Sequence, residues 1–485
     1  MLQRPPFPRT SAAAADKARR LLERALGPSK VITSAEGCLA YAGDESDQEP
    51  VVPDAVALAE SADDIARALA AASEAGVPVV PRAGGSGKSG GAVPVAGGIV
   101  IATQGMNRIK EIDRRERLVV VEPGVLLADL HAAVEAEGLF YPPDPNSLKI
   151  CCLGGNIAEN AGGPRAFKYG VTRDYVLGLE VLLVDGTPLR TGRRTTKGVT
   201  GYDVTALLVG SEGTLAVTTE ATLRLVPRPA AVATLLGLFA DVAGAGAAVE
   251  AILGAGLVPR CIELLDGGTL DAVRARGVAI DARAGALLIL EVDGDPLSCE
   301  AAMERTGTVC SDAGALDVLV AQDPAQRDRL WEARRQMSPA TRAMARFKIS
   351  EDVVVPRTLM VDLLGAIDRI RERLNPDGSD LSTTGIRILT YGHAGDGNLH
   401  VNFLWNDPAA APRVQEGLAL LFHAVLERRG TLSGEHGIGT SKAEFLPLEQ
   451  SEALIALQLR LKAAFDPRGL LNPHKIFPRR GHGAC

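Results

Sequence analysis

Short apolar runs alternate with longer amphipathic stretches in the first part of this chain. Residues 53–59 (PDAVALA) and 77–80 (VPVV) have the composition of strands, and the stretch between them is predicted as a helix. Ser61 precedes Ala-Asp-Asp, a typical helix start because the serine oxygen accepts a free backbone N–H and acids favour the first turn. Gly76 supplies the stop. The pattern therefore predicts strand, helix and strand in succession.

The same reasoning extends to residue 228. It predicts a helix from Arg19 to Leu26 after an N-terminal tail, strands at 98–103 and 119–125, and a helix at 127–137 that ends at Gly138. The glycine-punctuated segments 169–170, 201–204 and 209–215 are expected to continue as short strands.

Beyond residue 230 the pattern changes to strand, helix, strand, strand, helix, strand. The six segments are Thr234–Phe239, Ala243–Ala255, Arg260–Leu265, Ala286–Val292, Ser298–Thr306 and Ala315–Val320. This order predicts a ferredoxin-like domain. A helix is expected to open at Leu330, a strand at Phe347, and a further helix before Asp466.

A glycine-rich stretch, YGHAGDGNLHVN at residues 391–402, is flanked by strand-like residues and predicts a β-hairpin with residues 394–397 at its tip. His393 then ends one strand and His400 lies in the other. Side chains alternate faces along a strand, so Asn398, His400 and Asn402 share one face.

A second glycine-rich stretch, SGEHGIG at residues 433–439, adds Glu435 and His436. The two stretches together offer two imidazoles and a carboxylate for a divalent metal, with one imidazole left to act as a base. The alternative is that these histidines are ordinary core or surface residues. Periodicity does not say whether the hairpin closes onto the second stretch.

The loop PRAGGSGKSGG at residues 81–91 follows the predicted strand 77–80. Its glycines let the backbone turn N–H groups inward, as in a nest for phosphate oxygens. A dinucleotide fingerprint is weakened because Pro94 and a strand follow instead of a helix, and a phosphate-loop ATPase motif is weakened because Arg82 replaces its first glycine. A plain flexible loop is the alternative.

Composition limits the possible classes. The 485 residues predict two or three domains, and 46% hydrophobic with 23% charged residues are typical of a globular protein. The net charge of -7 argues against a nucleic-acid surface. Seven cysteines without a C-x-x-C pair indicate reduced thiols in a cytoplasmic protein. No run reaches a membrane span, and the N-terminus lacks the apolar segment of a secretory signal; a mitochondrial presequence and peripheral attachment through a partner stay open.

The order of several motifs resembles the FAD-binding (PCMH-type) domain of the vanillyl-alcohol oxidase superfamily. These are PRAGGSGKSGG, PPDP, GGNIAENAGG, KYG, GYDV and GSEGTLAVTTEATLRL, while YGHAGDGNLH, SGEHGIG and AAFDPRGLLNPHKIFP resemble the FAD-linked oxidase C-terminal domain. The resemblance covers residues 48–478. It is closest to the group of glycolate oxidase flavin subunits, D-lactate dehydrogenases and D-2-hydroxyglutarate dehydrogenases.

The resemblance implies an α+β fold in five segments. They are an N-terminal helix and tail (1–47), the FAD-binding domain (48–228), a substrate or cap domain with the histidine hairpin (229–425), a C-terminal segment that returns to the FAD domain (426–478) and a tail (479–485).

It also implies the FAD contacts. The matching residues are Pro81, Arg82, Ala83, Gly84, Gly85, Ser86, Gly87, Ser89, Pro143, Asp144, Gly154, Gly155, Asn156, Asn160, Ala161, Gly162, Tyr169, Gly170, Gly213, Val217 and Asn472. Some relatives attach FAD through a histidine where Ser86 stands, so non-covalent FAD is implied.

The activity implied is oxidation of a D-2-hydroxy acid to the 2-oxo acid, with hydride passing to flavin N5. In the resembling enzymes the metal, zinc or manganese, is held at the positions of His393, His400 and Glu435, and the base is at the position of His436. The resemblance places Arg334 and Lys348 on the substrate carboxylate, with Asn402 as a further polar contact.

Two other functions stay open. One is a non-catalytic FAD subunit of a glycolate-oxidising complex, and the other is an oxidase of an aryl or ether-lipid alcohol on the same fold. The electron acceptor is a quinone, a cytochrome, an iron–sulfur partner or oxygen. A homodimer and attachment to the inner face of the membrane are compatible with the sequence.

Overall fold

The computed structural model describes residues 7–479, so most of the predicted tails, residues 1–6 and 480–485, lie outside the described residues. The described chain forms two compact units. The N-terminal unit comprises residues 7–163, 170–228 and 435–479, and the central unit comprises residues 164–169 and 229–434. The chain therefore leaves the N-terminal unit after Arg228 and re-enters it at Glu435. Among residues 7–479, no helix is both long and apolar enough to cross a bilayer.

The N-terminal unit is built on two sheets. The first has the order β1 (Val31–Ile32), β2 (Ala55–Leu58), β4 (Ile99–Ala102), β3 (Val79–Arg82), with β2, β4 and β3 parallel. The second is antiparallel with the order β5 (Ile109–Asp113), β6 (Leu118–Val121), β10 (Val217–Arg224), β8 (Val176–Leu182), β9 (Pro188–Gly192). A short pair joins β7 (Leu139–Phe140) to β11 (Val226–Pro227).

Eight helices of the described residues lie in this unit. They are α1 (Ala12–Leu26), α2 (Ala35–Leu39), α3 (Ala62–Ala75), α4 (Leu127–Ala136), α5 (Leu153–Glu159), α7 (Val204–Leu208), α15 (Leu446–Glu449) and α16 (Glu452–Phe465). Helices α1 and α3 pack together, and their apolar faces share one core with β2, β3 and β4. This arrangement leaves the carboxyl end of β3 leading into the glycine-rich loop.

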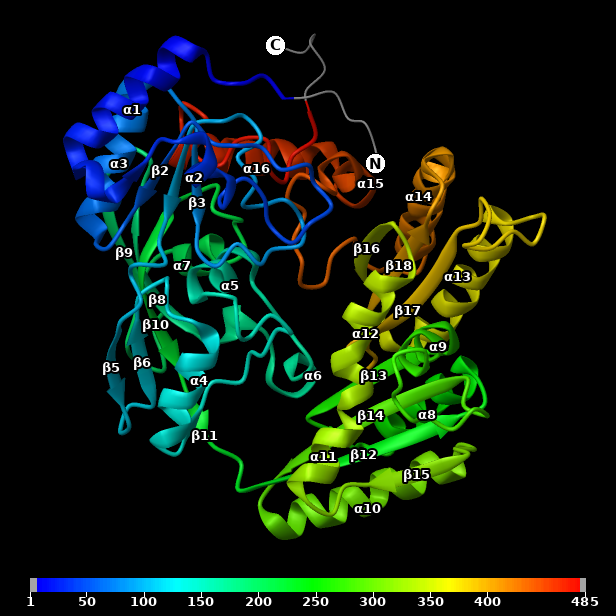
Figure 1. Cartoon of the computed structure of the whole chain (residues 1–485). Helices are drawn as coiled ribbons and strands as arrows, with labels where there is room; N and C mark the ends of the chain where they lie inside the picture. Colours follow the sequence, from blue (N-terminus) through cyan, green and yellow to red (C-terminus); the bar gives the residue numbers. More distant parts are fainter. Residues whose placement is uncertain (1–6, 480–485) are drawn as a thin grey trace. The chain divides into compact units, whose positions relative to one another are not determined.

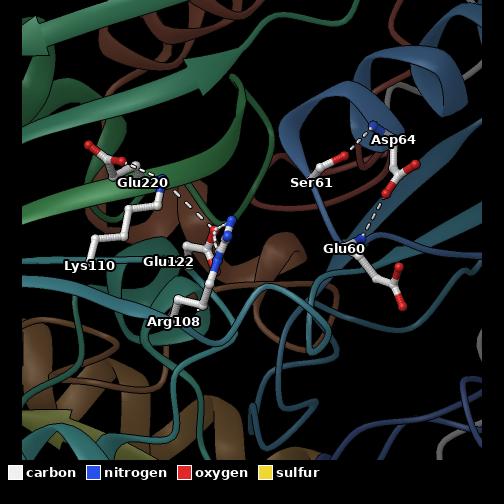
Figure 2. Close-up of polar contacts among 7 residues, drawn as sticks. All are labelled: Glu60, Ser61, Asp64, Arg108, Lys110, Glu122 and Glu220. Carbon is white, nitrogen blue, oxygen red and sulfur yellow. Dashed lines mark hydrogen bonds and ion pairs between the residues drawn. The ribbon is translucent and has the colours of Figure 1, made fainter.

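The predicted ends of α3 are confirmed. Ser61 Oγ accepts the backbone N–H of Asp64 at 3.2 Å, and the Asp64 carboxylate accepts the N–H of Glu60 at 3.1 Å, as Figure 2 shows. Gly76 ends the helix in the left-handed region with φ of 70°. Local sequence signals alone therefore determine where this helix starts and stops.

A buried carboxylate anchors the edge of the second sheet. Glu122 accepts hydrogen bonds from the Arg108 guanidinium, the shortest at 2.6 Å, and Lys110 reaches across to Glu220 at 2.6 Å (Figure 2). Burial alone would raise the pKa of Glu122, but the hydrogen bonds from Arg108 outweigh burial and lower it. The folded state therefore favours the charged form of Glu122.

Two expectations for this unit were wrong. The first helix begins at Ala12, not Arg19, because Ser11 caps it and the alanines that follow are strong helix formers. The glycine-punctuated segments 169–170, 201–204 and 209–215 were expected to be short strands, but none of them is a strand. Tyr169 ends the helix Ala166–Tyr169, Val204 begins α7 with Asp203 as its N-cap, and β10 begins only at Val217. Glycine spacing marks turns in this region and does not identify the elements between them.

The central unit is a seven-stranded antiparallel sheet. Its order is β15 (Asp317–Val320), β12 (Ala231–Phe239), β14 (Ala286–Gly294), β13 (Cys261–Asp266), β17 (Arg387–His393), β18 (Asn398–Trp405), β16 (Phe347–Val354). The first four strands have the ferredoxin-like order, as the sequence predicts. The hairpin β17–β18 and strand β16 extend that sheet on the side of β13.

Helices cover both faces of this sheet, as can be followed in Figure 1. One face packs against α8 (Val242–Gly254), α10 (Pro296–Asp312), α13 (Met360–Leu374) and α14 (Ala411–Glu427). The other packs against α9 (Gly267–Arg274), α11 (Pro324–Leu330) and α12 (Glu332–Met344); the short α6 (Ala166–Tyr169) completes the unit. The polar side chains of the candidate site project from the α9 and α12 face.

The predicted hairpin is confirmed, with residues 394–397 connecting β17 to β18. Gly397 has φ of +80°, and a Cβ there would lie 2.1 Å from the Val355 carbonyl oxygen, so only glycine fits. The register pairs Tyr391 with His400 and His393 with Asn398. Cross-strand partners share a face, so both histidines lie on one side of the sheet.

Candidate functional site

The glycine-rich loop after β3 is held by close backbone packing. A Cβ on Gly84 would lie 2.6 Å from the Ile150 carbonyl oxygen, and Gly155 of α5 lies beside Ala83. The glycine-rich loop 81–91 and a second glycine-rich lining, residues 154–163 (GGNIAENAGG), therefore meet within the N-terminal unit. This second lining begins in the short helix α5, which ends at Asn160 in the left-handed region with φ of 54°.

Three predicted cofactor residues converge from distant parts of the chain. Gly213 has φ of +65°. An ideal Cβ on this residue would lie 3.4 Å from the Pro81 side chain and 3.7 Å from the Asn472 side-chain amide. Asn472 Nδ2 donates to the backbone carbonyls of Gly91 at 3.0 Å and Glu212 at 2.8 Å. The C-terminal segment thus closes over the first glycine-rich loop inside this unit.

Several buried polar atoms in this cradle have no hydrogen-bond partner among the described residues. They are Arg82 Nε, Ser89 Oγ and Asn472 Oδ1. A buried polar atom without a partner costs about 1–3 kcal/mol, so such atoms point to a missing polar ligand. A donor set with a guanidinium, a hydroxyl and many loop N–H groups suits the phosphates and polar ring edge of FAD. The residues present therefore fit this cofactor.

The remaining predicted cofactor residues occupy varied positions. Pro143 contributes its carbonyl to His131 Nε2 at 3.0 Å, Asn160 Oδ1 accepts the N–H of Arg173, and the Ala161 carbonyl accepts the hydroxyl of Thr172 at 2.7 Å. The Val217 side chain packs in the core shared by α1 and α3. Tyr169 belongs to the central unit, where its hydroxyl donates to Asp293 at 2.7 Å.

The imidazoles of His393 and His400 lie side by side in the central unit. Their ring centroids are 5.4 Å apart in an edge-to-face arrangement, and both residues are buried. His393 Nδ1 is 2.5 Å from Glu263 Oε1, which comes from the neighbouring strand β13. Burial would raise the pKa of Glu263, but the interactions of its carboxylate with His393 and Arg334 prevail and lower it to about 2. Glu263 is therefore a carboxylate.

Arg334, on α12, approaches the same carboxylate from the opposite side. Its Nε donates to Glu263 Oε2 at 2.5 Å, and its Nη1 lies 3.6 Å from Met337 Sδ. Its Nη2 is buried and has no hydrogen-bond partner among the described residues. Because a guanidinium cannot shed its charge, this donor calls for an anionic or polar ligand.

The other predicted substrate residues are engaged with the protein. Lys348 Nζ donates to Thr341 Oγ1 at 2.9 Å. Asn402 Nδ2 donates to the carbonyls of Leu389 at 3.3 Å and His400 at 3.1 Å, so its amide fastens the hairpin backbone. Asn402 is fully buried.

Glu435 and His436 are the first two residues of the last chain segment of the N-terminal unit, residues 435–479. The His436 Nε2 lies 3.9 Å from Glu435 Oε1. An ideal Cβ on Gly162 would lie 3.3 Å from Glu435 Oε2, so this carboxylate rests against the second glycine-rich lining. The buried Glu212 carboxylate accepts the N–H groups of Ile438 at 2.8 Å and Gly439 at 2.7 Å and so fixes the backbone just after His436.

Four buried charged residues of these surroundings were missed by sequence reasoning. They are Glu263, Glu212, Asp352 and Lys475. Burial raises the pKa of Glu212 and lowers that of Lys475 to about 8. A signal existed for Glu263, because a carboxylate inside the apolar strand CIELLD requires a buried partner.

Comparison with protein families gives the class. Residues 53–192 match the model described as FAD binding domain, and residues 228–476 match the model described as FAD linked oxidases, C-terminal domain. The chain therefore belongs to the FAD-linked oxidase family and is an FAD-dependent oxidoreductase.

Individual relatives narrow this class. The chain is 42% identical to glycolate oxidase subunit GlcD of Bacillus subtilis (strain 168), over 93% of this chain and 95% of the relative. It is 34% identical to D-lactate dehydrogenase of Anaerostipes hadrus, with 87% and 89% covered. It is 32% identical to D-2-hydroxyglutarate dehydrogenase of Stutzerimonas stutzeri (strain A1501), with 96% and 99% covered.

A solved structure supports the predicted fold. p-Cresol methylhydroxylase is 16% identical and superposes with a TM-score of 0.79 over 96% of this chain and 97% of that one. The superposition confirms the predicted α+β fold, and the two family models confirm the predicted family.

Proposed function

We propose that this protein oxidises a D-2-hydroxy acid to the corresponding 2-oxo acid, with FAD bound non-covalently. The names of the relatives support this class of substrate. Bound FAD supplies the hydride acceptor. Ser86, not histidine, stands at the position through which some members of the superfamily attach the flavin, which supports non-covalent binding.

The observation that carries the choice of an acid substrate is the guanidinium of Arg334. Its Nη2 is buried without a partner, while its Nε is fixed by Glu263. A substrate carboxylate would meet this donor and satisfy it. We infer that Lys348, which lies within hydrogen-bond distance of Thr341, adds a second positive charge for the same anion. An oxidase of an aryl or ether-lipid alcohol would need no residue that binds a substrate carboxylate.

We infer that His393, His400 and Glu435 hold a divalent metal, zinc or manganese. The two buried imidazoles on one sheet face support this donor set. Glu435 is bonded directly to Gly434, whose N–H is held by Asp352 of β16 at 2.8 Å. A metal bound here would act as a Lewis acid on the oxygens of the hydroxy acid.

We assign proton removal to His436. Glycines on the C-terminal side of His436 and the Glu212 anchor at Ile438 and Gly439 set the direction of this short segment. Neighbouring residues in an extended segment point in different directions, so Glu435 and His436 can serve different roles. Asn402 is proposed to assist by holding the hairpin, since its amide bonds to Leu389 and His400 carbonyls.

The experiment that tests this function uses the purified protein with a redox dye. The substrates are a panel of D- and L-2-hydroxy acids, with matched simple alcohols as controls. Only the D-2-hydroxy acids should bleach the flavin. Treatment with a chelator should abolish turnover without loss of FAD, and zinc or manganese should restore it. A protein whose flavin is reduced by none of the acids would instead support a non-catalytic FAD subunit.

We further propose that electrons leave the flavin to a partner that carries a quinone, cytochrome or iron–sulfur centre. The relative from Bacillus subtilis is named as a subunit, which supports a partner chain. The six cysteines of the described residues are free and buried, which supports a cytoplasmic location. We propose that attachment to the inner membrane face, where it occurs, is through that partner. We also propose that the protein forms a homodimer.

A further inference from the structure

We propose that Glu263 is a positioning residue that fixes the His393 tautomer and the Arg334 orientation at the same time. This inference rests on the proposed function, because it concerns the metal ligand and the carboxylate-binding residue of that site. Glu263 touches neither substrate nor cofactor in this proposal. It acts through the two side chains that it holds.

The geometry leaves one assignment of protons. Glu263 Oε2 accepts from Arg334 Nε at 2.5 Å, and Oε1 lies 2.5 Å from His393 Nδ1. A carboxylate paired with a guanidinium has no proton to donate. His393 Nδ1 must therefore carry a hydrogen, and in the neutral ring this leaves the Nε2 lone pair for a metal. Carboxylate–histidine pairs behind a metal ligand act in this way.

The anchor itself is rigid. Strands β13 and β17 are paired in antiparallel register, with Glu263 opposite His393. The Glu263 side chain is fully buried, and the side chains of His393 and Arg334 are almost so. Burial keeps bulk solvent away from the two carboxylate oxygens. The position of Arg334 on α12 is therefore coupled, through a single carboxylate, to the ring plane of His393.

A purely structural ion pair would behave differently. Its loss would lower the free energy of unfolding but leave metal affinity unchanged. Replacing another buried carboxylate of the same sheet would then have the same effect. Glu291 provides the matched comparison. It is a buried carboxylate on the adjacent strand β14, lies 3.5 Å from Arg260, and accepts from Trp331 Nε1 at 2.9 Å.

The test compares Glu263→Gln with Glu291→Gln by titrating Mn²⁺ into metal-free, FAD-loaded protein. A glutamine at position 263 has only one oxygen, so it meets either His393 or Arg334 with an N–H where an acceptor is required. Mn²⁺ affinity should fall about 10- to 100-fold in Glu263→Gln, the range typical for loss of a partner behind a metal ligand. KM for the hydroxy acid should rise as well. Glu291→Gln should bind Mn²⁺ as the wild type does.

Unchanged Mn²⁺ affinity in folded Glu263→Gln, or an equal loss in both variants, would overturn the positioning role. A second measurement needs no Glu263 variant. Nitrogen NMR of ¹⁵N-histidine-labelled, metal-free wild type, with the His393 signal identified from a His393→Gln sample, should show the Nδ1–H tautomer. An Nε2–H tautomer would refute the inference. If the wild type binds no metal but shows Nδ1–H, the proposed metal site fails while the orientation of His393 by Glu263 stands.

Discussion

The carboxylate of Asp352 accepts the backbone N–H of Gly434 at 2.8 Å through one oxygen and the hydroxyl of Ser433 at 2.9 Å through the other. Asp352 is fully buried and lies opposite His400 in the sheet register. The proposed metal ligand His400 on β18 therefore lies beside Asp352 on β16, and Asp352 anchors the segment that leads into Glu435.

Asp352→Asn should therefore weaken metal binding. The asparagine amide would point an N–H at one of the two donors, Ser433 or Gly434, so a hydrogen bond to a charged group worth about 1.5–3 kcal/mol would be lost. We expect a lower melting temperature and an Mn²⁺ affinity reduced by about tenfold. The control is Asp362→Asn, which changes a largely exposed carboxylate on α13. Wild-type Mn²⁺ affinity in Asp352→Asn would show that this anchor does not orient the ligand segment.

His436→Ala and His393→Ala should fail in different ways. Losing a positioned base costs a factor of about 10² to 10⁴ in rate. The rate of flavin reduction by substrate should therefore fall by that factor in His436→Ala, which should retain metal and FAD. His393→Ala should instead lose the metal. Stopped-flow flavin absorbance and metal analysis separate the two. The base assignment is wrong if His436→Ala reduces flavin at the wild-type rate across neutral pH, or loses activity only by shedding metal.

Arg334→Lys should impair substrate binding although charge is conserved. A lysine cannot bond Glu263 and a substrate carboxylate in the same fixed fork. Loss of a charge-assisted hydrogen bond of about 1.5–3 kcal/mol corresponds to a roughly 10- to 150-fold drop in kcat/KM. The neighbouring Arg335, which pairs with Glu332 on the surface of α12, gives the control Arg335→Lys. Equal kcat/KM in both variants would remove Arg334 from the carboxylate site.

FAD should dissociate when the protein is precipitated with acid. Ser86 provides no imidazole for a covalent bond, so the yellow colour should appear in the supernatant. Absorbance at the flavin maximum in supernatant and pellet measures this directly. A yellow pellet that resists repeated washing in denaturant would contradict non-covalent attachment.

Acid stability should depend on Glu122. Its pKa is lowered in the folded protein from the usual 4.5, so the unfolded chain binds its proton first as pH falls. The stabilisation is complete above that usual value and is lost as pH drops through the lower, folded pKa. Glu122→Gln should be less stable at neutral pH, with a flatter loss of stability below about pH 5.

Chemical denaturation at several pH values checks this prediction. Glu116→Gln is the control, because Glu116 is exposed near the same edge of the sheet. Parallel stability-against-pH curves for Glu122→Gln and wild type would show that Glu122 makes no linked contribution.

Local features of this protein were determined by its sequence alone. Ser61 and Gly76 set the ends of α3, and Gly397 permits the turn between β17 and β18, because capping and turn formation depend on residues only a few positions apart. The ferredoxin-like order followed from the succession of elements, and the flavin class from motifs that resemble a family.

Only the tertiary structure decided which buried groups meet. Glu263 lies 130 residues before His393, and their contact exists because β13 pairs with β17 in one particular register. Likewise the Asn402 amide meets the Leu389 and His400 carbonyls because β17 pairs with β18 in one register. Pairing between distant strands depends on the packing of the whole sheet and its covering helices, which short-range propensity and spacing do not encode.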